Sequence, residues 1–93
     1  MRQYELVFIV HPDLDDDALN EVIAQVSSWI SDEDGEITNT ELWGKRKLAY
    51  PIRKQTEGYY VIMQTKMTMT VDSQLERNFQ LLEPVMRYSI IAI

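Results

Sequence analysis

Six segments with a clear hydrophobic period follow one another along this chain, in the order strand, helix, strand, strand, helix, strand. The strands are expected at residues 2–10, 36–48, 59–67 and 85–93, and the helices at about 15–31 and 70–82. Two strand–helix–strand units with right-handed crossovers interleave into one four-stranded antiparallel sheet. We therefore predict that residues 1–93 form a single α+β domain, a ferredoxin-like βαββαβ sandwich with both helices on one face of the sheet.

Several local signals set the expected boundaries. Aspartates crowd the start of the first helix, from Asp13 to Asp17, where carboxylates can cap free amides. A calcium loop would need a glycine that this segment lacks. Gly35 is placed for a left-handed helix cap, and Gly44 predicts a bulge or bend inside the second strand. Residues 49–57 include Pro51 and are predicted to be a loop.

The period-two alternation of the strands separates two faces of the sheet. The face under the helices is expected to hold Tyr4, Leu6, Phe8, Tyr59, Val61, Met63, Tyr88 and Ile90. No helix is left to cover the other face, and such an open apolar surface is usually a contact site. We assign the partner-protein face to Val7, Ile9, Tyr60, Ile62 and Ile91.

The positive charge of the chain is gathered in one stretch. The chain has 15 acidic and 9 basic side chains, yet residues 45–54 hold five of the basic ones and no acid. A polyanion responds to this local field and not to the net charge of −6. The candidate RNA-binding residues are Lys45, Arg46, Lys47, Arg53 and Lys54, with Arg2 and Arg87 extending the patch and Tyr50 packing on a ribose or base. A solvated loop with no ligand is the open alternative.

The side chains that support catalysis are scarce. His11 is the only histidine, and no serine or cysteine stands near it to be activated. There is no cysteine and no glycine-rich phosphate loop, so we expect no enzyme activity, no cofactor and no bound metal. The stacking pattern of RNA recognition motifs is also poorly matched, because Glu57 replaces its first basic residue and Val61 its second aromatic. No apolar run is long enough for a membrane span, so a cytoplasmic protein is expected.

Three segments resemble the family of bacterial small-subunit ribosomal protein number six. They are the start MRQYELVFIVHPDL, the central GKRKLAYPIRKQTEGYYVIMQ and the ending LLEPVMRYSII, and the likeness runs in order over essentially the whole chain. The central block is the most specific. The resemblance implies a ferredoxin-like structural protein of the small ribosomal subunit. It also implies binding to the central domain of small-subunit ribosomal RNA, as a heterodimer with small-subunit ribosomal protein number eighteen.

The resemblance also indicates which basic residues belong to the RNA-binding surface. The basic positions that match the family pattern are Arg2, Lys45, Arg46, Lys47, Lys54 and Arg87, whereas Arg53 falls where the family varies. It implies neither a membrane partner nor a small-molecule substrate. The rival reading from the residues is a homodimeric ferredoxin-like module that binds a small molecule, with Val7, Tyr60, Ile62 and Ile91 as its dimer face. A second rival is a small regulatory domain of a larger protein.

Overall fold

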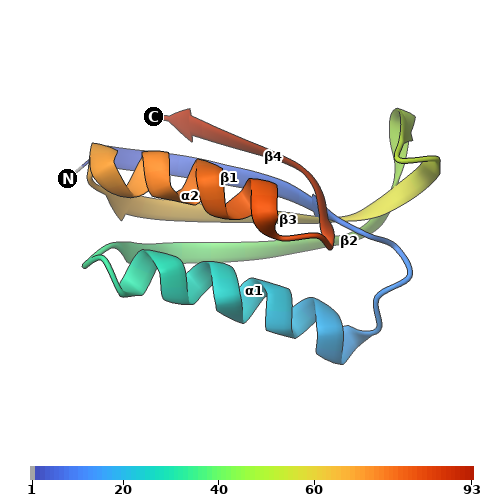
Figure 1. The fold of residues 1–93 in the computed structure, drawn as a ribbon, viewed down its shortest axis with the longest axis horizontal. Coiled ribbons are helices and arrows are strands. Elements are labelled where there is room, and N and C mark those ends of the chain that lie inside the picture. Colours follow the sequence, from blue (N-terminus) through green and yellow to red (C-terminus); the bar gives the residue numbers. More distant parts are fainter. Residues whose placement is uncertain (1) are drawn as a thin grey trace.

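A computed structural model describes residues 2–93, apart from the side chains of Met69, Thr70 and Asp72. Its elements are β1 (Arg2–Val10), α1 (Asp16–Ser31), β2 (Glu36–Ile52), β3 (Gln55–Met67), α2 (Met69–Leu81) and β4 (Val85–Ala92). The four strands form one antiparallel sheet in the order β2-β3-β1-β4, and the two helices run side by side in front of it (Figure 1). The predicted ferredoxin-like sandwich is therefore confirmed.

The core lies between the helices and one face of the sheet. Phe79 of α2 contacts Phe8 of β1, Trp29 of α1 and Tyr88 of β4, with ring centroids 5.4, 5.7 and 5.1 Å away. One aromatic side chain thus joins both helices to two strands. All eight predicted sheet residues of the core lie in this cluster, although Tyr59, Tyr88 and Ile90 are only partly buried.

The start of α1 is explained by its sequence. Asp15 is the N-cap residue, and its carboxylate accepts a hydrogen bond from the backbone N–H of Ala18 at 2.8 Å. At the other end the prediction for Gly35 was wrong, since Asp34 takes the left-handed conformation with φ 62°. Gly35 is needed for space instead, because a Cβ there would lie 2.7 Å from the Ile30 side chain.

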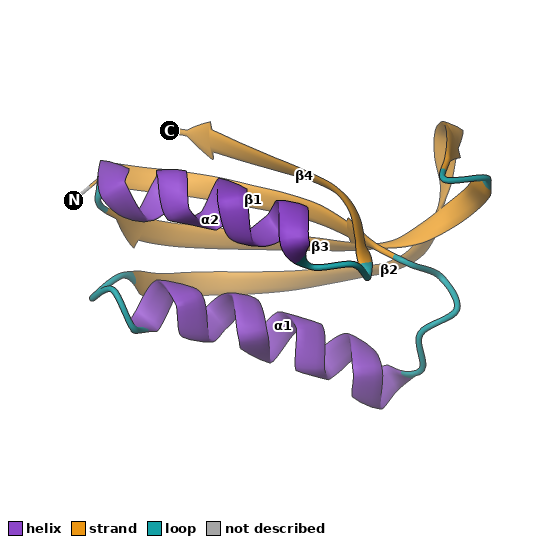
Figure 2. Cartoon of the chain, in the orientation of Figure 1, coloured by secondary structure: helices purple, strands orange, loops and turns teal. Residues whose placement is uncertain are grey.

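The predicted loop at residues 49–57 was wrong. β2 continues to Ile52, β3 begins at Gln55, and the two strands are joined by a two-residue turn at Arg53 and Lys54. The resulting hairpin extends well beyond the helices (Figure 2). Pro51 is tolerated because β2 is an edge strand and because its pairing with β3 is interrupted between Lys47 and Ile52.

Candidate nucleic-acid interface

Six basic side chains lie at one end of the sheet. β2 and β3 pair Lys45 with Tyr59 and Lys47 with Glu57, just before the hairpin turn. β1 links this end to β4, because Ile9 pairs with both Tyr60 and Arg87. We call this surface the basic end; it consists of Lys45, Arg46, Lys47, Arg53, Lys54 and Arg87. The structure therefore brings together six of the seven basic residues predicted from the sequence.

Arg2 is the predicted residue that lies elsewhere. It pairs with Met67 at the opposite end of the sheet, seven positions along β1 from the Ile9 that pairs with Arg87. At about 3.3 Å per residue, this separation is about 23 Å. Arg2 is exposed, but it cannot share a continuous patch with the basic end.

The central basic trio points to two sides of the edge strand β2. Lys45 Nζ lies 5.3 Å from the ring centroid of Tyr59, which packs against the helix-side core. Arg46 turns to the open side, where its Cζ lies 4.9 Å from the ring centroid of Trp43. All three side chains are exposed, so both sides of one sheet edge carry positive charge.

The end of the hairpin folds across the open face. Tyr50 is the acceptor of a hydrogen bond from the Arg87 guanidinium, which also lies over the tyrosine ring at 5.3 Å. In the turn, the guanidinium of Arg53 donates to the backbone carbonyls of Glu83 and Val85, at 2.8 and 3.3 Å. Tyr50, Arg53 and Arg87 therefore tie the hairpin to β4, which commits part of their hydrogen-bonding capacity.

The basic end makes no salt bridge among the side chains that the structure describes, although Glu57 lies opposite Lys47 in the pairing of β2 with β3. The ion contact in that part of the chain joins His11 to Asp13, at 3.9 Å and away from these cations. Lys54 at the tip has no recorded hydrogen-bond partner among the described residues. The acidic chain thus exposes one concentrated positive surface that is available to an anion.

The residues predicted for a partner-protein face lie on the sheet side without helices, but most of them are partly shielded. Ile9 and Ile62 are only 8% and 7% exposed, and Val7 and Tyr60 are intermediate. Ile9 and Tyr60 line a hollow of about 220 Å³. Its other lining residues are Arg87 and, from the folded hairpin, Leu48, Ala49, Tyr50 and Ile52. Ile91, further along β4, is 48% exposed. The apolar surface that remains accessible therefore lies toward Val7 and Ile91.

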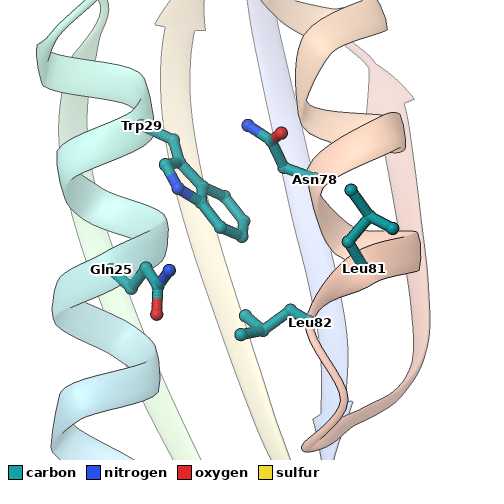
Figure 3. A pocket seen from close by; sticks show the side chains of 5 residues that line it. All are labelled: Gln25, Trp29, Asn78, Leu81 and Leu82. Atoms are coloured by element: carbon teal, nitrogen blue, oxygen red, sulfur yellow. The ribbon is translucent and has the colours of Figure 1, made fainter.

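Another hollow, of about 240 Å³, lies between α1 and α2 (Figure 3). Trp29, Gln25, Asn78, Leu81 and Leu82 line it, and none of these side chains is charged. Typical ligand sites measure roughly 300–1,000 Å³, so this hollow is small. The described residues contain no acidic, histidine or cysteine cluster that could hold a metal ion.

Trp43 lies beside the basic end but was not among the predicted site residues. Its indole is 46% exposed beside the basic trio, and its Nε1 donates to the Glu41 carboxylate at 3.0 Å. A tryptophan directly before the glycine of a basic stretch was a signal that could have pointed to it. No helix in the part of the chain that the structure describes is long and apolar enough to cross a membrane.

Comparisons with known proteins agree along almost the full length. The family model of ribosomal protein S6 matches residues 3–92. Small ribosomal subunit protein bS6 of Caldanaerobacter subterraneus is 44% identical over 98% of this chain and 96% of its own length. The protein of the same name from Moorella thermoacetica is 41% identical over 97% of this chain and 92% of its own.

A solved structure agrees as well. The crystal structure of 30S ribosomal protein S6 from Thermotoga maritima superposes with a TM-score of 0.94 at 26% identity, covering 99% of this chain and 87% of that one. Sequence and fold thus lead to the same family, as the resemblance of the three segments predicted. The chain belongs to the ribosomal protein S6 family, whose members are structural proteins of the small ribosomal subunit and not enzymes.

Proposed function

We propose that this protein binds the central domain of small-subunit ribosomal RNA through its basic end, as a heterodimer with small-subunit ribosomal protein eighteen. Its family is that of a cytoplasmic ribosomal component. The observation that carries the proposal is the basic end itself, because an acidic chain gathers six cations there, and none of them forms a salt bridge among the described residues. Arginine offers bidentate contacts to phosphate and lysine a mobile point charge.

The partner is assigned to the accessible part of the open sheet face. Val7 and Ile91 leave apolar surface exposed on the side without helices, and a protein neighbour can bury it. Arg87 stands on the same face and in register with Ile9, so a protein on this surface would lie next to the basic end. Such a partner can add its own positive charge to the RNA contact.

The conformation of the hairpin turn also supports an RNA contact at the tip. Arg53 and Lys54 have φ values of 50° and 65°, which are costly for side chains other than glycine, asparagine or aspartate. A two-residue turn of this kind normally prefers Asn-Gly. The presence of two cations in these positions is explained if their charge contributes more to RNA binding than their backbone strain costs in stability.

Binding of a central-domain RNA transcript, measured across a salt series with and without the partner, tests the proposal. With about five phosphates engaged, log Kd against log salt should have a slope of magnitude about 3.5–4.5 for the heterodimer. The chain alone should bind weakly because its net charge is −6. The proposal would be contradicted if the Kd of the heterodimer for RNA did not change with salt. It would also be contradicted if the partner did not change the affinity of this chain for RNA.

The partner contact has its own control. Ile91→Lys places a positive charge against a basic partner. Because Ile91 is half-exposed, the substitution should not disturb the fold. The variant should associate with protein eighteen about 10-fold more weakly, as expected for the loss of a contributing interface residue. If the affinity for protein eighteen is unchanged, the partner binds to a different surface of this chain.

Lys54→Gly should have opposite effects on stability and on RNA binding. Glycine adopts the observed φ of 65° without strain, so the free energy of unfolding should rise by about 0.5–1 kcal/mol. The salt slope for RNA should fall in magnitude by roughly 0.7–0.9, since one phosphate contact is lost. Urea denaturation and the RNA titration measure the two effects. Lys66→Ala, at the other end of the sheet, is the matched control and should leave RNA binding unchanged.

A further inference from the structure

Trp43 and Arg46 form a stacked pair on the open side of β2. The guanidinium lies over the indole with 4.9 Å from Cζ to the ring centroid, and Arg46 Nε donates to the backbone carbonyl of Trp43 at 3.3 Å. The Glu41 carboxylate holds the indole Nε1 at 3.0 Å and so fixes the plane of the ring. The pair is therefore pre-ordered, although both side chains are exposed.

A bulge creates this pairing. In a regular strand, residues three positions apart point to opposite faces, so Trp43 and Arg46 would not meet. Here the register with β3 shifts between Leu42 and Gly44, and Gly44 has φ 80°. A positive-φ glycine is the usual means of forming such a bulge, and it returns Arg46 to the side of Trp43.

The chemistry of the pair fits an unpaired nucleobase. Bases that leave a helix stack on aromatic rings and on arginine planes, and Trp43 keeps 46% of its surface exposed for such a contact. The terminal nitrogens of Arg46 have no recorded hydrogen-bond partner within the described residues. An apolar protein partner would instead have to bury the charges of both Arg46 and Glu41, which is costly.

We propose that Trp43 and Arg46 form a stacking platform for one unpaired base of the small-subunit ribosomal RNA. This inference rests on the proposed function, because the basic end must first bring RNA to this edge. Lys45 and Lys47 flank Arg46 along β2 but point to the other side of the sheet, so they would engage phosphates of RNA that passes along this edge. The stacked base adds affinity that does not depend on salt.

Two variants, Trp43→Leu and Trp43→Phe, are compared in the complex with protein eighteen. Leucine keeps an apolar side chain but no ring, whereas phenylalanine keeps a ring on which a base can stack. Loss of one base–aromatic stack corresponds to roughly 5- to 150-fold weaker binding. We expect about 10-fold weaker binding of the central-domain transcript for leucine and less than about 3-fold for phenylalanine. The salt slope should stay at the wild-type value in both. In a Trp29→Phe background, RNA should quench the fluorescence of Trp43, which is then the only tryptophan.

The outcomes separate the two proposals. If the wild-type heterodimer binds RNA and the Trp43→Leu variant binds it equally well, the stacking platform is disproved and the proposed function stands. A Trp43→Leu variant that loses protein eighteen and not RNA assigns Trp43 to the protein partner and overturns the inference. A wild-type heterodimer without RNA binding overturns both. Unchanged urea midpoints confirm that the exposed substitutions leave the fold intact.

Discussion

Replacing Lys45, Arg46 and Lys47 together with alanine is expected to weaken RNA binding by the heterodimer by about 10²–10³-fold at low salt. Each phosphate contact contributes roughly 0.7–0.9 to the salt slope, so the magnitude of the slope should fall by about 2–3. All three side chains are exposed on an edge strand, and none is in the recorded ion contact. The measurement is a titration of the central-domain transcript at several salt concentrations.

The control removes positive charge outside the basic end. Lys66→Ala with Arg77→Ala changes the net charge by two, yet neither residue lies near the hairpin in the pairing register or in the chain. This variant should bind RNA nearly as the wild type does. Equal losses per charge removed, two in the control and three in the test variant, would mean that only the total charge matters. The basic end would then have no special role.

Replacing Phe79 with alanine is expected to lower the free energy of unfolding by about 3–5 kcal/mol. Phe79 is 2% exposed and contacts three aromatic rings, on α1, β1 and β4. Its loss leaves a cavity at the point where four elements meet. Because small domains are stable by only about 5–15 kcal/mol, the change removes a large share of the total. Chemical denaturation with a constant m-value provides the measurement.

Leu81→Ala, on the same helix, is the matched comparison. Leu81 is 79% exposed although it lines the hollow between the helices, so its truncation should cost less than about 0.5 kcal/mol. Alanine has the highest helix propensity, so a loss cannot come from that source in either variant. Similar losses for both variants would therefore show that the aromatic cluster has no special weight in the stability of the fold.

The architecture could be predicted from the sequence because helix and strand periods are strong signals here. Val22, Val26 and Ile30 recur at four-residue spacing and are all buried, as the pattern indicated. The error at residues 49–57 has a physical cause. Leu48, Tyr50 and Ile52 alternate like a strand, but Pro51 usually excludes one, and only knowledge that β2 is an edge strand removes that objection.

The site was predictable in its residues but not in its arrangement. The clustering of Lys45, Arg46 and Lys47 along the chain indicated a charged surface, but not the aromatic rings over which Lys45 and Arg46 lie. The distance of Arg2 from the other cations follows from the sheet register, which sequence spacing does not contain. The contact of Trp43 with Arg46 depends on a single positive φ at Gly44, a tertiary detail.

The bond from Arg53 to the carbonyls of Glu83 and Val85 has a consequence for synthesis of the chain. The ribosome makes the hairpin about thirty residues before it makes the acceptors that hold the hairpin down. Until residues 83–85 are made, a nascent chain therefore lacks the two carbonyl groups that accept these hydrogen bonds. The geometry that fixes Arg53 at the hairpin turn is a late product of synthesis, although the turn itself is local in sequence.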